Sequence, residues 1–176
     1  MVGAVFAIDV TSGTVTALQP RAFFFFTLNS AAPVVTSLCF FLGVALAEEL
    51  GYRFFCGPWV LAWSRRRWIA IAVPGLIYGL THTRLEFLPP VEPWWGRAAV
   101  LTVVGCVWGW AFFRYDALTV VLSHFTADLF IFNWPRLATG DPWITTVSAL
   151  TIAVPLLPAA AWWLGALPRR RWRRAV

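Results

Sequence analysis

Long apolar segments with almost no charge are the feature that most constrains how this chain folds. Residues 98–113 and 143–167 contain no Asp, Glu, Lys or Arg. Segments of this length match the hydrocarbon core of a bilayer when they are helical. Backbone polar groups find no water there, so spanning segments are helices or closed barrels. The apolar runs lack the period-two alternation of barrel strands, so we expect an all-α fold, a polytopic transmembrane bundle of about five to six membrane helices.

Composition excludes an ordinary soluble domain. Hydrophobic residues make up 60% of the chain and charged residues 12%, whereas a soluble domain carries roughly a quarter charged residues. All fourteen basic residues are Arg, and they lie in the turns and at the C-terminus rather than in a nucleic-acid-binding motif. We therefore expect the lipid bilayer as a partner, and no nucleic acid.

The breaks between apolar segments divide the chain. Residues 1–33 form an N-terminal, partly apolar segment that we interpret as a half-span or an interfacial piece. Residues 34–167 form the transmembrane domain, and residues 168–176 a basic cytoplasmic tail. Within the domain we expect helices at 34–56, 68–82, 97–115, 116–134 and 143–167.

Local signals refine these helices. Gly57-Pro58 should break or kink the first one, and Pro74 lies inside the second. Asp116 is a suitable N-cap for the fourth. Gly105 and Gly109 form a G-x-x-x-G pattern, which favours close packing of the third helix against a neighbour. The stretches 83–96 and 135–142 are rich in Pro and polar residues and are expected to be loops.

Arginine distribution predicts the orientation. With alternating helix ends, nine arginines fall on one side: Arg65, Arg66, Arg67, Arg114, Arg169, Arg170, Arg171, Arg173 and Arg174. Three fall on the other side: Arg84, Arg97 and Arg136. The positive-inside rule places the side with nine arginines in the cytoplasm. We expect an integral membrane protein of a bacterial plasma membrane with its C-terminus cytoplasmic.

Six ionisable residues interrupt the apolar helices, and such residues usually face a cavity or a partner. They are Glu48, Glu49, Arg53, His82, His124 and Asp128. The helical rise places Glu48 roughly 24 Å, His82 roughly 22 Å, and His124 and Asp128 roughly 15 and 21 Å from the cytoplasmic turns. Three helices therefore bring carboxylates and imidazoles to similar depths.

Helical spacing predicts which of these side chains share a face. Glu49 and Arg53 are four residues apart, in the favourable order for an ion pair, and His124 and Asp128 are also four residues apart. Glu48 lies about 100° round the helix from Glu49. We expect Glu49 and Arg53 to neutralise each other while Glu48 remains free for chemistry.

Two chemistries suit two histidines and two carboxylates. In the first, a carboxylate takes a proton from water while the histidines orient it and stabilise an oxyanion. In the second, His82, His124, Asp128 and Glu48 hold Zn²⁺ in a hydrolytic site. Residue types alone leave both open. Each residue taken singly also has a structural interpretation, as a helix–helix contact, and a proton relay would use similar groups. No internal repeat of the kind found in transporters is present.

The order of the polar motifs adds a resemblance. The stretches "EELGYR" (48–53), "YGLTH" (78–82) and "HFTAD" (124–128), with "GCVWGW" (105–110) before the last, resemble the CPBP intramembrane proteases, also called the Abi or type II CAAX prenyl protease family. Together the motifs cover about residues 34–130. The resemblance implies a membrane-embedded endopeptidase that acts on a membrane protein or a lipidated peptide.

Roles follow from this resemblance position by position. It implies Glu48 as the base that activates water, with His82, His124 and Asp128 as the other catalytic residues. Glu49, Arg53 and Tyr78 would be supporting residues. Tyr78 stands where the family has Phe, and Asp128 stands at a position shared by Asn and Asp. The family is described both as metalloproteases and as metal-free glutamate proteases, so Zn²⁺ stays open. The alternative is a non-catalytic scaffold or immunity protein with the same fold.

Overall fold

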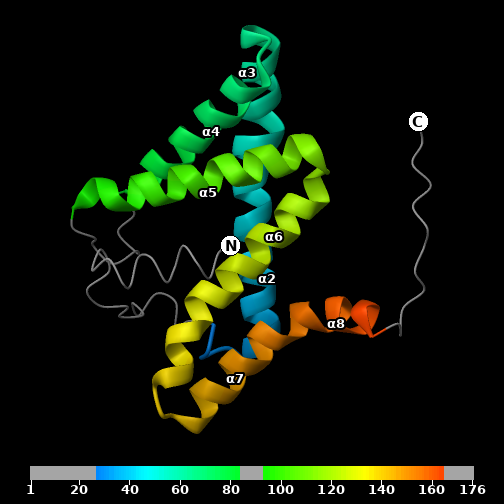
Figure 1. Cartoon of the computed structure of the whole chain (residues 1–176). Coiled ribbons are helices and arrows are strands. Elements are labelled where there is room, and N and C mark those ends of the chain that lie inside the picture. The colour runs from blue at the N-terminus through cyan, green and yellow to red at the C-terminus, as the bar shows by residue number, and fades with distance from the viewer. Residues whose placement is uncertain (1–26, 84–92, 165–176) are drawn as a thin grey trace.

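The described part of the chain consists of a series of helices (Figure 1). The computed structural model describes residues 27–83 and 93–164, and these residues contain helices and turns but no strand. Most of the expected N-terminal segment, most of the 83–96 loop and the basic tail lie outside the described residues. The elements are α2 (Pro33–Glu49), η2 (Leu50–Cys56), α3 (Gly57–Ser64), α4 (Arg67–Thr81), α5 (Trp94–Arg114), α6 (Ala117–Asn133), η3 (Trp134–Ala138), α7 (Pro142–Ala153), η4 (Val154–Leu156) and α8 (Leu157–Trp163).

The all-helical membrane fold is confirmed. Among the described residues, three helices are long and apolar enough to cross a bilayer: Pro33–Ser64, Trp95–Arg114 and Ala117–Ala138. Two further apolar helices, Arg67–Thr81 and Pro142–Leu156, are shorter. The chain is thus an integral membrane protein, and the expected count of five to six spans stays a prediction.

The first helix does not break at Gly57-Pro58, although a break was one of the two outcomes expected there. It runs from Pro33 to Ser64, and its irregular part is the π-helical turn η2, which ends immediately before Gly57. A proline lacks an N–H, and its ring crowds the carbonyl four residues earlier. A π-helical turn widens the hydrogen-bond ladder at that point, so Pro58 is accommodated and the chain continues into α3.

The last expected helix, 143–167, is not one straight span. It is divided into α7 and α8 by the 3₁₀ turn η4, and α8 leaves in a new direction (Figure 1). Pro155 lies in this turn and removes a helical hydrogen bond there. The predicted start of α6 is confirmed, because Asp116 caps this helix by accepting the Thr119 N–H at 2.6 Å. The predicted start of α5 is a few residues late, because α5 begins at Trp94, inside the expected loop.

Glycines bring α4 and α5 into backbone contact. A Cβ at Gly75 would lie 2.9 Å from the Cys106 nitrogen, and one at Gly105 would lie 2.9 Å from the Gly75 Cα. At Gly79 a Cβ would overlap the Ala98 carbonyl. The close-packing face expected at Gly105 is thereby confirmed, because no larger side chain fits between these helices.

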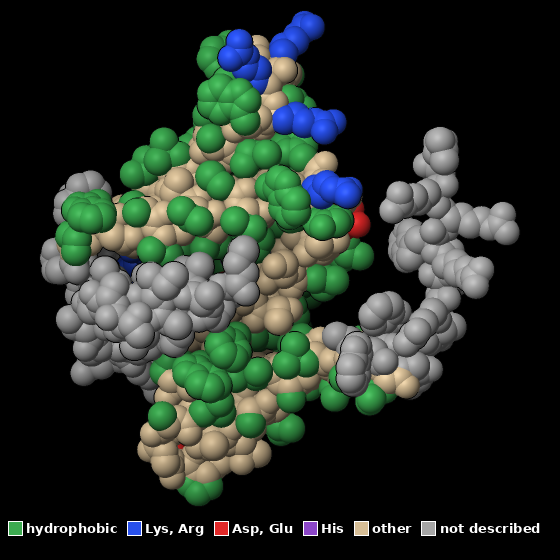
Figure 2. All heavy atoms as spheres, in the orientation of Figure 1, with side chains coloured by type: hydrophobic (Ala, Val, Ile, Leu, Met, Phe, Trp, Pro, Cys, Tyr) green, Lys and Arg blue, Asp and Glu red, His purple; other side chains and the backbone are tan. Residues whose placement is uncertain are grey.

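Helices α2 and α6 cross through an apolar layer. Phe41 and Ala45 of α2 pack with Phe125 and Leu129 of α6. Elsewhere hydrophobic side chains cover much of the visible surface, while basic side chains gather toward the end that carries the α3–α4 turn (Figure 2). An apolar exterior is what a bilayer solvates, so the polar groups described next stand out by being inside.

Candidate active site

Glu49 and Arg53 form a buried ion pair where α2 passes into η2. Arg53 Nη1 lies 3.2 Å from Glu49 Oε1, and the two side chains are 1% and 0% exposed. Arg53 Nη2 donates to the Gly105 carbonyl at 3.2 Å. The guanidinium also lies over the rings of Tyr78 and Trp108, at 4.7 and 5.5 Å from their centroids. These cation–π contacts and hydrogen bonds offset the loss of water around a buried charge.

Glu49 has a second partner that sequence spacing did not reveal. His124 Nδ1 of α6 lies 2.7 Å from Glu49 Oε1. A carboxylate held by Arg53 accepts hydrogen bonds, so we assign the Nδ1 proton to His124. The other ring nitrogen, His124 Nε2, then points at Glu48 Oε2, 3.6 Å away, and at Asp128 Oδ2, 3.5 Å away. Glu49 therefore orients the imidazole as well as neutralising Arg53.

His82 is oriented in the same sense from another helix. It directly follows α4, and its Nδ1 lies 2.7 Å from the Tyr78 carbonyl oxygen. A carbonyl only accepts, so Nδ1 carries the proton. His82 Nε2 faces Glu48 Oε1 at 3.4 Å.

Glu48 therefore sits between two imidazoles, with one carboxylate oxygen facing each. Its side chain is 25% exposed, against 11% for His82, 13% for Asp128 and 1% for His124. Glu48 Oε2 is buried and has no hydrogen-bond partner. In the neutral tautomers both Nε2 atoms are acceptors, as is the carboxylate. Such a set of acceptors suits a small molecule with two O–H donors, of which water is the simplest.

The four residues named as metal ligands, His82, His124, Asp128 and Glu48, do come together. Yet among residues 27–83 and 93–164, no group of three or more His, Cys, Asp or Glu side chains is arranged to hold a metal ion. The Nδ1 atoms are taken by Glu49 and the Tyr78 carbonyl, and the Nε2 atoms face carboxylate oxygens directly.

Several residues around the site were not predicted. The Trp108 ring stacks on His124 with centroids 4.2 Å apart and planes 22° apart, and its Nε1 donates to Ser123 Oγ at 3.1 Å. Tyr52 and Thr81 share a hydrogen bond of 2.7 Å next to His82. With twelve Trp in the chain, residue type gave no reason to choose Trp108. Tyr52, by contrast, lies inside the "EELGYR" motif and was a visible candidate.

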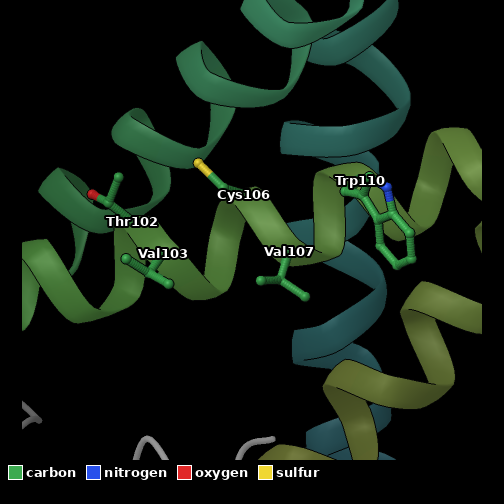
Figure 3. Close-up of a pocket in the computed structure, with 5 residues that line it drawn as sticks. All are labelled: Thr102, Val103, Cys106, Val107 and Trp110. Carbon is green, nitrogen blue, oxygen red and sulfur yellow. The ribbon is translucent and has the colours of Figure 1, made fainter.

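A separate hollow lies on the outer side of α5, away from these residues. It measures about 300 Å³ and is lined by Thr102, Val103, Cys106, Val107 and Trp110 (Figure 3). Its lining is almost wholly apolar, and none of the six ionisable residues contributes to it. Such a surface is suited to lipid chains and supplies no catalytic group.

Comparison with known protein families identifies the family of this chain. The family model described as "Type II CAAX prenyl endopeptidase Rce1-like" matches residues 30–130. This range is more than half of the chain and contains all six ionisable residues of the site. None of the curated proteins matches the chain, and none of the solved structures does.

Proposed function

Because the chain belongs to the Rce1-like family of type II CAAX prenyl endopeptidases, we propose that it hydrolyses peptide bonds within or beside the bilayer with a water molecule activated by Glu48. The observation that carries this proposal is the placement of Glu48 between His82 Nε2 and His124 Nε2, at 3.4 and 3.6 Å. His82 lies at the end of α4 and His124 lies in α6. A role of either histidine only in the packing of its own helix does not explain why both face the same carboxylate.

In the proposed mechanism, water donates its hydrogens to Glu48 and to an adjacent Nε2. Glu48 removes a proton as the water oxygen attacks the carbonyl carbon of the scissile bond. The proton then passes to the leaving amine as the C–N bond breaks, so protons and electrons balance. Each imidazole holds its Nδ1–H in a fixed hydrogen bond, so each Nε2 is held in place to orient water.

Oxyanion stabilisation would fall to His124. A protonated His124 Nε2 can donate to a negative oxygen, and the Glu49 carboxylate at 2.7 Å from Nδ1 stabilises that imidazolium. Asp128 Oδ2 lies 3.5 Å from the same Nε2, so its carboxylate would also stabilise the imidazolium. Glu49, Arg53 and Tyr78 act as supports, because they hold His124 and the helix carrying Glu48 together.

The test is Glu48→Gln in the full chain. We expect at least a hundredfold loss of cleavage, the size typical for loss of a general base, seen by comparing peptide termini in membranes with each form. Asp141→Asn is the matched control, because Asp141 is an exposed helix cap that accepts the Ile144 N–H at 2.9 Å, and Asn caps as well as Asp. A folded Glu48→Gln protein with undiminished cleavage would leave the non-catalytic scaffold as the better explanation.

Metal dependence needs its own measurement. Measuring the zinc content of the purified parent protein and of His124→Ala distinguishes the metal-free mechanism from a zinc-dependent one. We expect no stoichiometric Zn²⁺ in either protein. One equivalent in the parent that is lost in His124→Ala would contradict the metal-free mechanism.

We also propose the orientation and the substrate class. Arg65, Arg66 and Arg67 are exposed at the α3–α4 turn, and Arg114 is exposed at the end of α5 (Figure 2). These ends would face the cytoplasm of a bacterial plasma membrane, together with the tail 168–176. From its family, the domain 34–167 would act on a membrane protein or a lipidated peptide. A C-terminal fluorescent-protein fusion that fluoresces supports this orientation, and an active C-terminal alkaline phosphatase fusion contradicts it.

A further inference from the structure

A chain of hydrogen bonds runs from η2 to His82 through residues outside the polar cluster. The Tyr52 hydroxyl lies 2.7 Å from Thr81 Oγ1. Thr81 Oγ1 donates to the Tyr78 carbonyl at 3.0 Å, and the same carbonyl lies 2.7 Å from His82 Nδ1. Two side chains, those of Thr81 and His82, thus meet at the Tyr78 carbonyl oxygen, and Tyr52 joins them through Thr81.

The direction of every bond in this chain is determined. A threonine hydroxyl has one hydrogen, and it goes to the Tyr78 carbonyl. Tyr52 must therefore donate its own hydrogen to Thr81 Oγ1. His82 Nδ1 must also be the donor to the carbonyl, because a carbonyl oxygen carries no hydrogen. The order is Tyr52 O–H to Thr81 O–H to Tyr78 C=O, with His82 Nδ1–H arriving from the other side.

The end of α4 explains why this carbonyl is available. His82 directs its backbone N–H to the Gly79 carbonyl at 3.3 Å, three residues back, instead of to Tyr78. The last carbonyls of a helix lack backbone partners and are satisfied by side chains. Here two side chains do so, and one of them is a residue of the candidate site.

We propose that Tyr52 and Thr81 are positioning residues for His82. Their hydrogen bond ties the end of α4 to η2, the segment that begins directly after Glu48 and Glu49. The tie fixes how far His82 Nε2 lies from Glu48 Oε1, and the Tyr78 carbonyl fixes which nitrogen carries the proton. The role of Tyr52 and Thr81 in catalysis rests on the function proposed above. The hydrogen bonds that position His82 do not depend on that function.

Tyr52 offers a clean way to break the tie. Its ring packs edge-on against the Tyr78 ring, with centroids 5.2 Å apart and planes at 89°. Tyr52→Phe keeps that contact and removes only the hydroxyl. Thr81→Val removes the middle of the chain with little change of shape, and Thr81→Ser restores the hydroxyl and serves as the matched control.

The first measurement does not depend on activity. The chain contains two histidines, so ¹⁵N-histidine spectra of the full protein in nanodiscs show two imidazoles, which His82→Gln assigns. Under alkaline conditions we expect His82 to be the Nδ1–H tautomer. Without the bond to η2, the end of α4 should shift and lengthen the bond from His82 Nδ1 to the Tyr78 carbonyl. The ratio of this tautomer to the Nε2–H form should therefore fall about three- to tenfold in Tyr52→Phe and Thr81→Val, the range for one hydrogen bond. His124 should not change, and Thr81→Ser should match the parent.

The second measurement is cleavage of a membrane peptide identified with the Glu48→Gln comparison. We expect kcat to fall about three- to tenfold in Tyr52→Phe and Thr81→Val with KM unchanged, and to recover in Thr81→Ser. Circular dichroism and elution as one species verify folding, and Tyr52→Phe decides if Thr81→Val does not fold. An unchanged His82 tautomer ratio in folded Tyr52→Phe overturns the proposal. If Glu48→Gln cleaves normally, the proposed function fails, yet the spectra still decide the role of Tyr52 and Thr81.

Discussion

Two buried polar regions of this protein use their hydrogen bonds differently. In the candidate site the bonds join separate helices: Glu49 of α2 meets His124 of α6, and Arg53 of η2 meets the Gly105 carbonyl of α5. At the far end of α6 the bonds stay local. Asn133 donates to the Leu129 carbonyl of its own helix at 2.9 Å.

The same local pattern continues around that second region. Thr151 donates to the Val147 carbonyl of α7 at 2.8 Å, and Arg136 donates to Asn133 Oδ1 at 3.1 Å, three residues back. Arg136, Asn133 and Thr151 are 0% exposed, as is Glu49 of the site. Burial of polar groups thus does not distinguish the two regions. The hydrogen bonds named here do, because those of the site join separate helices, whereas those from Asn133 to Leu129, from Arg136 to Asn133 and from Thr151 to Val147 span three or four residues.

One face of α2 links the two regions. Ser37, Phe41, Ala45 and Glu49 recur every fourth residue, and all four are buried. Phe41 and Ala45 form the apolar layer with α6, so an apolar layer lies on this face between the polar residues at its two ends. Bonds between helices fix the relative positions of catalytic groups, whereas bonds within a helix satisfy polar atoms and leave helix positions to packing. The following substitutions test this contrast.

The largest effect is expected where a bond between helices also neutralises a charge. Arg53→Leu leaves the Glu49 carboxylate, which is 0% exposed, without its cation. Loss of one member of a buried pair costs about 3–5 kcal/mol, so the free energy of unfolding in detergent should drop by that amount. Arg53→Lys keeps the charge and should lose less. Equal stability of Arg53→Leu and the parent would show that Arg53 does not hold the helices together.

The next largest effect concerns the contact that lets Arg53 reach α5. Gly79→Ala places a Cβ against the Ala98 carbonyl, which is backbone and cannot move aside. We expect a loss of about 1–3 kcal/mol, typical for overpacking, measured by thermal unfolding. Gly43→Ala is the control, because a Cβ there meets nothing within 4 Å, and its better helix propensity should raise stability by up to about 1 kcal/mol. The same sign for both variants would contradict close packing of α4 and α5.

A smaller effect is expected for the ring that holds His124. Trp108→Leu removes the stacked indole and its hydrogen bond to Ser123, and should lower kcat about tenfold with KM unchanged. Trp108→Phe keeps an aromatic face and should lose about threefold. Trp110→Leu, in the apolar hollow away from the site (Figure 3), should retain parental kcat. A loss as large in Trp110→Leu would mean that general packing of α5, rather than His124, sets the rate.

Removal of a buried hydrogen bond should cost little stability in the second polar region. Thr151→Val removes a hydroxyl whose described hydrogen bond, to the Val147 carbonyl, lies within α7. The free energy of unfolding should change by less than about 0.5 kcal/mol, because the Val147 carbonyl keeps its place in the helix. A loss as large as that of Arg53→Leu would remove the distinction between the regions.

The smallest effect is a pH dependence at an exposed helix cap. The Thr119 N–H donates to the Asp116 carboxylate and holds the pKa of Asp116 below its usual value. The cap therefore contributes stability above the unfolded pKa of about 3.9, and this contribution is lost as pH falls through the lower folded pKa. The protection factor of the Thr119 amide against hydrogen exchange should fall over this acidic range. Asp116→Asn, which still caps but does not titrate, should show no such fall.

Much of the fold could be predicted because its causes are local. Apolar length gave the membrane helices, and Asp116 gave the start of α6. The Glu49–Arg53 pair followed from spacing along one helix. Outcomes that depended on context were not fixed by the sequence. The helix continued past Pro58, where a break or a kink was expected, because η2 widened its hydrogen-bond ladder, and the last segment was divided at Pro155. Both outcomes depend on how a proline is accommodated, which composition does not reveal.

The candidate site divides in the same way. Sequence alone singled out Glu48, Glu49, Arg53, His82, His124 and Asp128, because charge is rare in an apolar chain, and the order of their motifs led to the family. Only the tertiary structure decided that Glu49 serves His124 as well as Arg53, that Trp108 stacks on His124, and that Tyr52 and Thr81 fasten the helix end beside His82. The physical reason is that residue types and helical periods act within one helix. Which side chains meet across helices depends instead on where the glycines of α4 and α5 allow the backbones to approach.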